Sequence, residues 1–439
     1  MANVEFKCPN CGAPLSFDSS SQKVACPYCE AEFDVDDISI LKDAFKEDNK
    51  EELKWEDCSS AYSEEELSTL NVYHCSSCGG ELITDENTSA TSCPYCGSPV
   101  IISSRLEGEL KPNYVIPFKK NKEEAKQALK EYLKNKLFLP KVFKEENRID
   151  DIKGIYVPFW IYDADCEGSI TYKAMRQRMY VVGDYQYTER RYYKVVRDGI
   201  IGFNHIPVDG SSKMDDNLME SIEPFDFKEA KEFNHAYLTG YLSDKYDVSK
   251  EVCERRANER IRQETIDCFS RTVVGYNSFV ITGTSLSLKN SKVSYALYPS
   301  WILNTSFEKQ KFKFALNAQT GKLVGNLPCS KLKYTLWYLG FYLLSFLIVF
   351  LIGFGVSSDF SSDLALIIAL SVFISFIAPT VFCECFRRQL KPVKSQRGAS
   401  TYHRSGSEKL YVKKDIYLYK TVTRVRIRDN SSNSNPRRR

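Results

Sequence analysis

Two long apolar runs dominate the hydrophobic pattern of this chain. Residues 334–355 give 22 consecutive positions without a charged side chain, and residues 364–383 give another 20. As helices with a rise of about 1.5 Å per residue, these runs would measure about 33 and 30 Å, which matches the hydrocarbon core of a bilayer. The sequence therefore predicts two transmembrane helices joined by a short loop. Two buried core helices are the alternative interpretation.

Basic side chains lie on both outer flanks of this predicted hairpin. Lys331 and Lys333 precede the first run, and five basic residues follow the second, namely Arg387, Arg388, Lys391, Lys394 and Arg397. The loop between the runs carries Asp359 and Asp363 and no basic residue. Because the cytosolic flanks of membrane proteins are enriched in Lys and Arg, we expect a cell-membrane protein with both termini in the cytoplasm.

Shorter patterns between residues 105 and 330 predict an α+β middle domain. Asn121 followed by Glu124 is a helix-start signal, and a second helical pattern runs from Ser249 to about residue 269. Alternating apolar positions predict a β-meander over 153–208 and a hairpin over 311–325. Turns are expected at three glycine-containing pairs, which are Gly183-Asp184, Asp198-Gly199 and Thr320-Gly321.

Catalytic motifs are missing from the sequence. It contains no phosphate-binding loop, no G-x-S-x-G nucleophile elbow and no H-E-x-x-H pair. We therefore expect a protein without enzymatic activity. An enzyme with its site in the middle domain is the remaining alternative.

The N-terminal quarter of the chain contains a duplicated cysteine pattern. Two C-x2-C pairs with 14 residues between them occur twice, and each cysteine of the second set lies 67 positions after its counterpart. Both closing pairs read Cys-Pro-Tyr-Cys. A two-residue spacer aims both sulfurs at one ion, and two such pairs complete a tetrahedron. The predicted ligands are Cys8, Cys11, Cys26 and Cys29 in the first set, and Cys75, Cys78, Cys93 and Cys96 in the second.

A site filled by four thiolates leaves no position for water or substrate, which is typical of structural zinc. We therefore expect two structural Zn²⁺ ions in two small β zinc ribbons, residues 1–35 and 71–104. The thiols must stay reduced, as they do in the cytosol. Disulfide pairing and rubredoxin-type iron are the alternatives.

The net charge of +3 conceals an acidic head and a basic tail. Residues 1–104, which include an acidic linker over 36–70, contain 20 acidic residues and six Lys, a net charge of −14. Residues 386–439 contain 16 basic and three acidic residues, a net charge of +13. The head would repel a polyanion, since affinity for phosphates comes mainly from Lys and Arg. We expect the basic tail to bind anionic lipid. Nucleic acid as the partner and a tail that is simply solvated are the alternatives.

Eight short motifs are spread along the chain: Phe6-Lys7-Cys8-Pro9, Cys93-Pro94-Tyr95-Cys96-Gly97, Tyr114-Val115-Ile116-Pro117-Phe118, Pro158-Phe159-Trp160, Val208-Asp209-Gly210-Ser211-Ser212-Lys213-Met214, Glu223-Pro224-Phe225-Asp226, Arg256-Ala257-Asn258-Glu259-Arg260 and Gln319-Thr320-Gly321-Lys322. Together they resemble a family of uncharacterised bacterial membrane proteins with transcription-factor-IIB-type zinc ribbons. Members often carry a name borrowed from the primosomal replication-restart helicase. This chain has no ATP-binding motor, so helicase activity is not expected. The resemblance implies the eight cysteine ligands and no known substrate.

These observations predict a membrane-anchored cytosolic zinc-ribbon protein that binds or scaffolds another protein. The motivation is the closed metal sites, the acidic head and the presence of only two membrane spans. A nucleic-acid-binding protein at the membrane is the alternative, based on the ribbons and the basic tail.

Overall fold

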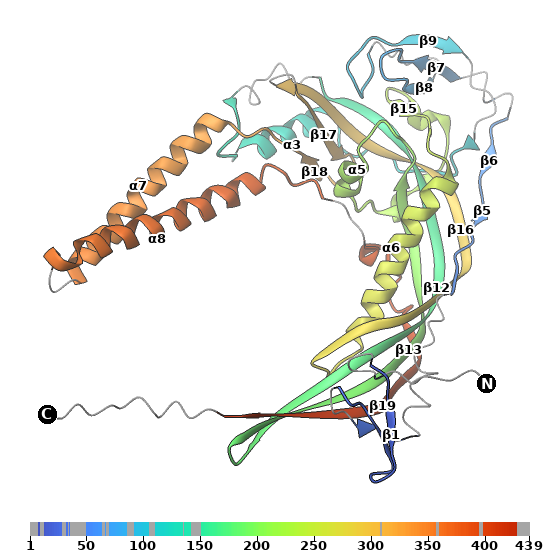
Figure 1. Cartoon of the computed structure of the whole chain (residues 1–439). Helices are drawn as coiled ribbons and strands as arrows, with labels where there is room; N and C mark the ends of the chain where they lie inside the picture. Colours follow the sequence, from blue (N-terminus) through green and yellow to red (C-terminus); the bar gives the residue numbers. More distant parts are fainter. Residues whose placement is uncertain are drawn as a thin grey trace.

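One long strand, β12 (Lys153–Val182), lies at the centre of the computed structural model (Figure 1). It pairs antiparallel along most of its length with β13 (Tyr185–Asp209) and with β16 (Ser278–Phe307). β19 (Lys409–Arg426) extends the sheet beyond β13. The structure describes residues 8, 13–28, 32–33, 35, 50–63, 66, 70–85, 92–104, 110–134, 136–141, 151–307, 310–356, 360–394 and 398–427.

Burial along β12 divides the strand into three zones. All side chains from 155 to 162 are buried, and from 163 to 174 buried positions alternate with half-buried ones. From 175 onward no side chain of the strand is buried. Successive side chains of a strand point to opposite faces. The strand is therefore covered on both faces at its start, on one face in its middle and on neither face at its end.

Short strands line the outer edge of β16. In order along that edge they are β4 (Lys50–Glu52), β5 (Glu56–Asp57), β11 (Tyr114–Val115) and β17 (Gln310–Asn317). β17 continues to β18 (Leu323–Gly325), and β11 to β14 (Lys231–Glu232). A separate pairing joins β6 (Ser60–Ala61) to β10 (Leu110–Lys111). The predicted hairpin over 311–325 is confirmed by the pairing of β17 with β18.

The helices of the middle domain begin where the sequence signals predict. In α3 (Lys122–Lys134), the Glu124 amide donates to Asn121 Oδ1 and the Asn121 amide to Glu124 Oε2, both at 2.9 Å. This is a reciprocal capping box. The second predicted helix is α6 (Lys250–Arg271), which lies across one face of the sheet (Figure 1). Among the described residues there are four shorter helices, α5 (Asp216–Ile222), η2 (Phe227–Glu229), η3 (His235–Leu238) and η4 (Ser400–Tyr402).

The predicted turn at Asp198-Gly199 is wrong, whereas the turn at Gly183-Asp184 joins β12 to β13 as expected. Asp198 and Gly199 lie inside β13, where the register with β19 shifts between them. Ser169 of β12 donates a 2.6 Å hydrogen bond to Asp198 Oδ1. A Cβ on Gly199 would clash with the Lys409 carbonyl of β19. The glycine thus permits close approach of two strands at a bulge instead of a chain reversal.

Part of the segment predicted as an acidic linker is ordered against the middle domain. Besides forming β4 and β5, it places Trp55 edge-on against Tyr162, with ring centroids 4.8 Å apart. Trp55 also donates a 2.9 Å hydrogen bond to Asn258 of α6. Glu51 lies 2.9 Å from Arg262 of the same helix. Glu51 and two other acidic residues of this segment, Asp57 and Glu66, therefore pair with basic residues of the middle domain.

The two predicted ribbons lie at opposite ends of the long sheet (Figure 1). The described part of the first contains β1 (Ser16–Asp18), β2 (Lys23–Ala25) and β3 (Glu32–Phe33). It packs on Leu418 and Tyr419 of β19. The second contains β7 (Leu70–His74), β8 (Glu81–Asp85) and β9 (Ile101–Ser104). β8 joins the main sheet through β15 (Leu242–Asp244), which pairs with the start of β12.

The apolar runs form two helices, α7 (Lys331–Val356) and α8 (Phe360–Arg388), which project away from the sheet as a hairpin (Figure 1). Both are long and apolar enough to cross a membrane. The chain after the hairpin differs from the expected tail, because residues 409–426 form β19 as an edge strand of the main sheet. Only two adjacent side chains of β19, Leu418 and Tyr419, are buried, so the pairing with β13 and not an apolar face holds most of this strand in place.

Candidate metal centre and the adjoining polar network

The second cysteine set forms a compact cluster that could hold a metal ion. The sulfurs of Cys75, Cys78, Cys93 and Cys96 all lie within 4.8 Å of one another. Two of the separations are 3.5 Å (Cys75 to Cys96) and 3.6 Å (Cys78 to Cys93). A disulfide bond would measure about 2.05 Å, so these are free thiols. Sulfurs at about 2.3 Å from a tetrahedral zinc would lie about 3.8 Å apart, so the cluster fits such an ion closely.

Each cysteine pair of this cluster sits on the same tight backbone turn. The Cys75 amide donates to the Gly80 carbonyl at 2.9 Å, and the Cys93 amide to the Ser98 carbonyl at 2.8 Å. The residue after each pair has a left-handed backbone, at Gly79 (φ +70°) and Gly97 (φ +78°). Only glycine adopts this conformation without a steric cost. The sequence motif therefore builds the ligand geometry locally.

The first cysteine set is described only in part. Cys8 and Cys26 are both buried and belong to one small apolar cluster. Cys11 and Cys29 lie outside the described residues. The Cys8 amide donates to the Ala13 carbonyl at 2.7 Å, which repeats the five-residue backbone bond of the second set. This local likeness agrees with the duplication seen in the sequence, and the first metal site itself stays a prediction.

The thiols of the second set have divergent acidities. Burial raises the pKa of Cys93 and of Cys78. Burial also acts to raise the pKa of Cys96, but hydrogen bonds from Ser98 and the neighbouring thiols outweigh it and lower this pKa to about 6. Four thiolates this close together repel one another strongly. A bound cation is the ordinary way to hold such a set ionised.

Two lysines of the middle domain lie within the electrostatic reach of these thiols. Lys153 donates to the Ser92 carbonyl at 3.1 Å, and Lys313 to the Lys213 carbonyl at 2.8 Å. Burial lowers the pKa of both ammonium groups, while negative charge on Cys93 opposes that change. A divalent ion bound by four thiolates carries a net charge of −2. Two nearby ammonium groups match that charge and could tune the centre from its second shell.

Tyr95 of the closing Cys-Pro-Tyr-Cys pair anchors the second ribbon in the middle domain. Its side chain is only 3% exposed, and its hydroxyl lies close enough to Asp244 for the two groups to influence each other's pKa. Asp244 also accepts a 2.5 Å hydrogen bond from Ser211. Burial raises the pKa of Asp244 to about 7, and raises that of neighbouring Asp209 well above its usual value. The ribbon thus touches a buried acidic centre.

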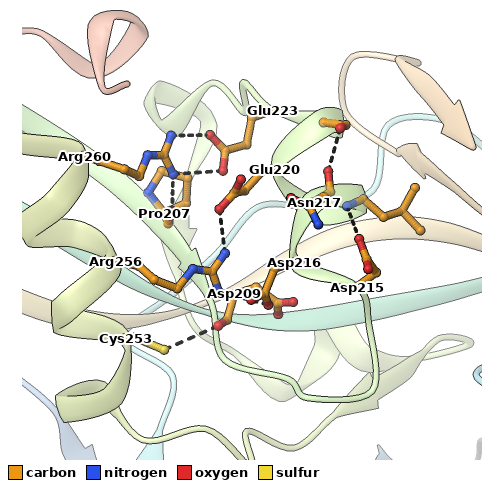
Figure 2. A network of polar contacts seen from close by, with 12 residues as sticks. Pro207, Asp209, Asp215, Asp216, Asn217, Glu220, Glu223, Cys253, Arg256 and Arg260 are labelled. Atoms are coloured by element: carbon orange, nitrogen blue, oxygen red, sulfur yellow. Dashed lines mark hydrogen bonds and ion pairs between the residues drawn. The ribbon is translucent and has the colours of Figure 1, made fainter. Parts of the chain in front are cut away.

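A buried ion pair forms the middle of the adjoining network (Figure 2). Arg260 Nη2 lies 2.8 Å from Glu223 Oε2, and the two side chains are 4% and 1% exposed. Arg260 also donates to the Pro207 carbonyl at 2.9 Å. Tyr402 donates a 2.7 Å hydrogen bond to Glu223 Oε2 and lies under the guanidinium. Burial raises the pKa of Glu223, although Arg260 and Tyr402 oppose that rise.

A second set of contacts extends the network along α6 (Figure 2). Arg256 lies 2.7 Å from Glu220 and 2.9 Å from Asp216, which are both in α5. Cys253 Sγ donates to the Asp209 carbonyl at 3.4 Å. Asp215 caps α5 by accepting the Leu218 amide at 3.0 Å. Two turns of α6 therefore hold α5 by ion pairs and the end of β13 by hydrogen bonds.

Five of the eight motifs named above meet in or beside this network, although the sequence alone indicates no role for them. The Gly210 amide donates to the Pro158 carbonyl at 2.9 Å. Gln319 accepts the Asp226 amide at 2.8 Å. Arg260 of a fifth motif pairs with Glu223, which lies in the same motif as Asp226. One feature of the sequence could have pointed to the network. Several of the motifs combine charged residues with apolar residues of the core, as Arg256-Ala257-Asn258-Glu259-Arg260 does. Their pairing could not be read from spacing.

A pocket of about 430 Å³ lies between the second ribbon and the middle domain. Its charged lining comes from Glu81 of the ribbon and from Lys213, Asp244, Lys245 and Asp247. Lys245 lies 2.8 Å from Glu81, and Lys213 lies 3.2 Å from Asp247. These ion pairs cross-link the ribbon and the domain locally, and their mixed charge points to no single class of ligand.

Removing Arg260 should destabilise the protein far more than removing a neighbouring arginine. The change Arg260→Met leaves Glu223 buried without its cation, and we expect a loss of about 3–5 kcal/mol in the free energy of unfolding. Arg262→Met is the matched control, because its pair with Glu51 is about 40% exposed on both sides and should contribute less than about 1 kcal/mol. Denaturant unfolding of the detergent-solubilised chain measures both. Equal losses would contradict the role given to the buried pair.

The raised pKa of Asp244 predicts a pH dependence of stability. Its pKa is about 7 in the folded chain and about 3.9 when unfolded, so the folded state retains the proton longer. Stability should therefore fall as pH rises from about 4 to 7, by roughly 1.4 kcal/mol per pH unit at most. Asp244→Asn removes this contribution to the pH dependence, because an amide does not titrate, and it keeps an oxygen that accepts the hydrogen bond from Ser211.

Thermal unfolding at pH 5.5 and pH 7.5 tests this expectation in the wild type and the variant. The wild type should lose more stability between the two conditions than Asp244→Asn does. Metal release at acidic pH affects both proteins alike, since their cysteines are identical. Parallel pH profiles would show that Asp244 is ionised in the folded chain.

Comparison with known proteins gives one informative relative. The chain is 35% identical over 337 residues to the uncharacterized protein YdjG of Bacillus subtilis (strain 168), an alignment that covers 77% of this chain and 94% of the relative. No family model matches the sequence, and no solved structure matches it. The extent and identity of this alignment show that the chain belongs to the same family as the uncharacterized protein YdjG.

Proposed function

We propose that this chain is a membrane-anchored cytosolic zinc-ribbon protein whose N-terminal ribbon binds another protein. In this proposal both ribbons carry structural zinc, and the α7–α8 hairpin anchors the chain in the cell membrane. The middle domain acts as a rigid scaffold between the two ribbons. No enzymatic step is part of the proposal.

The observation that supports protein binding is the different burial of two equivalent tyrosines, Tyr28 and Tyr95. Tyr28 and Tyr95 occupy the same place in the duplicated Cys-Pro-Tyr-Cys pair. Tyr95 is 3% exposed and packs into the middle domain, whereas Tyr28 is 76% exposed. Phe17 of the same ribbon is 55% exposed. Exposed aromatic side chains are enriched at the centres of protein interfaces, where they supply large contact area at low entropic cost.

Zinc is the favoured metal because the donor set is four thiolates in a closed arrangement. The cluster of the second ribbon has sulfur separations close to those around a tetrahedral ion. Rubredoxin-type iron uses the same geometry, so identification of the metal requires elemental analysis.

Membrane anchoring is supported by the surface of the hairpin. Apolar side chains along α7 remain exposed in the folded chain, including Leu343 (65%), Leu347 (53%) and Leu351 (56%). Water solvates such an apolar surface poorly, whereas the acyl chains of a bilayer solvate it well. The basic flanks favour an orientation with both termini in the cytoplasm, where cysteines stay reduced.

Nucleic-acid binding at the membrane is the second candidate. It is favoured by β19, which carries six basic residues and one acidic residue. A salt-sensitive complex of the full chain with duplex DNA or RNA, lost when the basic residues of β19 are replaced by Gln, would support this candidate. Binding that survives this replacement would assign nucleic acid to another surface.

Elemental analysis of the purified full-length chain should find two zinc ions per chain. Cys96→Ser should reduce this to one, because a four-thiolate site that loses one ligand releases its ion while the other ribbon is independent. Cys11→Ser should do the same for the first ribbon. Cys58→Ser is the control, since Cys58 is exposed and outside both sets. Loss of both ions from one substitution would show that the ribbons fold as one unit, and iron would indicate redox chemistry.

A photo-reactive phenylalanine analogue at Tyr28 should cross-link to a defined protein partner in intact cells. Phe17→Ala in the same chain should reduce the adduct severalfold without changing the thermal stability, because both side chains are exposed. The analogue placed at Val274, which is 66% exposed, serves as the control site. A matching set of adducts at both sites, or an adduct insensitive to Phe17→Ala, would reject the ribbon as the binding surface.

A further inference from the structure

The free end of the long sheet continues past its pairing with β16 and past helix α6. The pairing of β12 with β16 ends at Met175 and Ser278. The contact of α6 nearest to this end joins Ser270 to Tyr172 at 3.3 Å. Beyond them β12, β13 and β19 continue over about seven residues or roughly 23 Å of strand. The Gln177 amide still donates to Asn277 Oδ1 at 2.7 Å, and the first ribbon packs on Leu418 and Tyr419 at the base of this end. We call this end, residues 176–191 and 420–427, the sheet tip.

The sheet tip exposes large apolar side chains on both of its faces. Met179 and Val181 are each 59% exposed, Val182 is 58% exposed, and Val425 of β19 is 67% exposed. Val181 and Val182 are adjacent in one strand, so they point to opposite faces. A partner that packs on one face would leave the other apolar face in water. A surrounding apolar medium would cover both faces at once.

Basic residues surround these apolar positions. The sheet tip contains seven basic residues, Arg176, Arg178, Arg190, Arg191, Lys420, Arg424 and Arg426, and two acidic residues, Asp184 and Glu189, a net charge of +5. Arg178 lies over the ring of Tyr180, and Arg424 over that of Tyr185. Tyr180 and Tyr187 stack across the strands with centroids 5.4 Å apart. Tyrosine and arginine around an aliphatic end are typical of segments that enter the membrane interface.

The sheet tip and the membrane hairpin point to the same side of the molecule. Figure 1 shows α7 and α8 extending to the left, and the turn between β12 and β13 lying at the lower left below them. The end of β19, which pairs with Tyr185 next to that turn, runs in the same direction. A bilayer crossed by α7 and α8 would therefore lie on the side of the molecule toward which the sheet tip is directed.

We propose that the sheet tip inserts into the headgroup region of the anionic leaflet that borders the cytosol, as a second membrane contact. The aliphatic side chains enter the boundary of the acyl chains, and the arginines bind lipid phosphates around them. The inference rests on the proposed membrane anchoring by α7 and α8. Nucleic acid fits less well, because neither phosphates nor bases would bury Val181 and Val182 beside the turn that joins β12 to β13.

Photo-cross-linking in nanodiscs tests this contact with the full chain. The photo-reactive phenylalanine analogue is placed at Val182, at Leu347 of α7, or at Val252 of α6. Val252 is the matched control, because it is also a valine and is 47% exposed. The nanodiscs contain phosphatidylcholine alone or phosphatidylcholine with an equal amount of phosphatidylglycerol. Lipid adducts and protein adducts are separated and counted by mass spectrometry.

We expect lipid adducts at Val182 in the anionic nanodiscs, few in phosphatidylcholine, and none at Val252. Replacing Arg178 and Arg426 by Gln should weaken the contact at Val182 by about fivefold for each charge removed, since one basic residue contributes about that factor near an anionic surface. Both arginines lie on the exposed sheet tip, so the fold should persist.

The analogue at Leu347 separates failure of this inference from failure of the anchoring. Lipid adducts at Leu347 without any at Val182 would overturn the second contact and leave the anchor intact. Their absence at both positions would overturn both. A protein adduct at Val182, or lipid adducts there that duplex DNA displaces, would assign the sheet tip to a protein or to nucleic acid instead.

Discussion

The buried ion pair between Arg260 and Glu223 is the interaction on which the arrangement of the chain depends. Removing two charges from water is costly, and the cost is offset only when the remaining polar atoms are satisfied. Here the partners come from distant segments: the Pro207 carbonyl at the end of β13, and Tyr402 beyond the hairpin. The Gly398 carbonyl also accepts from Arg260. Correct burial of one pair therefore requires α5, α6, β13 and the returning chain to be in place together.

The surroundings of the central strand β12 change from its first residues to its last. The start of β12 is buried on both faces and joins the second ribbon through β15, and its middle is covered on one face. Its end has no cover and carries apolar residues among arginines. From Ile155 to Val182 the strand spans about 90 Å at roughly 3.3 Å per residue. One strand, with register shifts near Ala164 and Thr171, thus runs from beside the second cysteine cluster to the exposed sheet tip.

Local signals predicted the parts of this structure that local chemistry determines. The capping box of Asn121 and Glu124, the apolar lengths of α7 and α8, and the C-x2-C turns all act within a few residues. The misplaced turn at Asp198-Gly199 shows the limit, because the same dipeptide serves a bulge when a third strand passes beside it. The sequence did not predict β19 as part of the sheet, because its partner strand β13 lies more than 200 positions earlier. The pairing of Arg260 with Glu223 likewise depends on tertiary contact that spacing does not encode.

The duplicated ribbon shows how one motif can serve two physical roles. Both copies carry a tyrosine between the two closing cysteines. In the second copy the ring enters the middle domain beside Asp244, and ion pairs such as Lys245 with Glu81 hold the ribbon there. In the first copy the ring remains 76% exposed, and the buried ligands pack on β19 instead. A metal bound by the first cysteine set, as proposed, would supply rigidity without a large core and so let this ribbon leave its aromatic side chains exposed. In the proposed function, one motif thus attaches the second ribbon to the middle domain and leaves the first available to bind a partner.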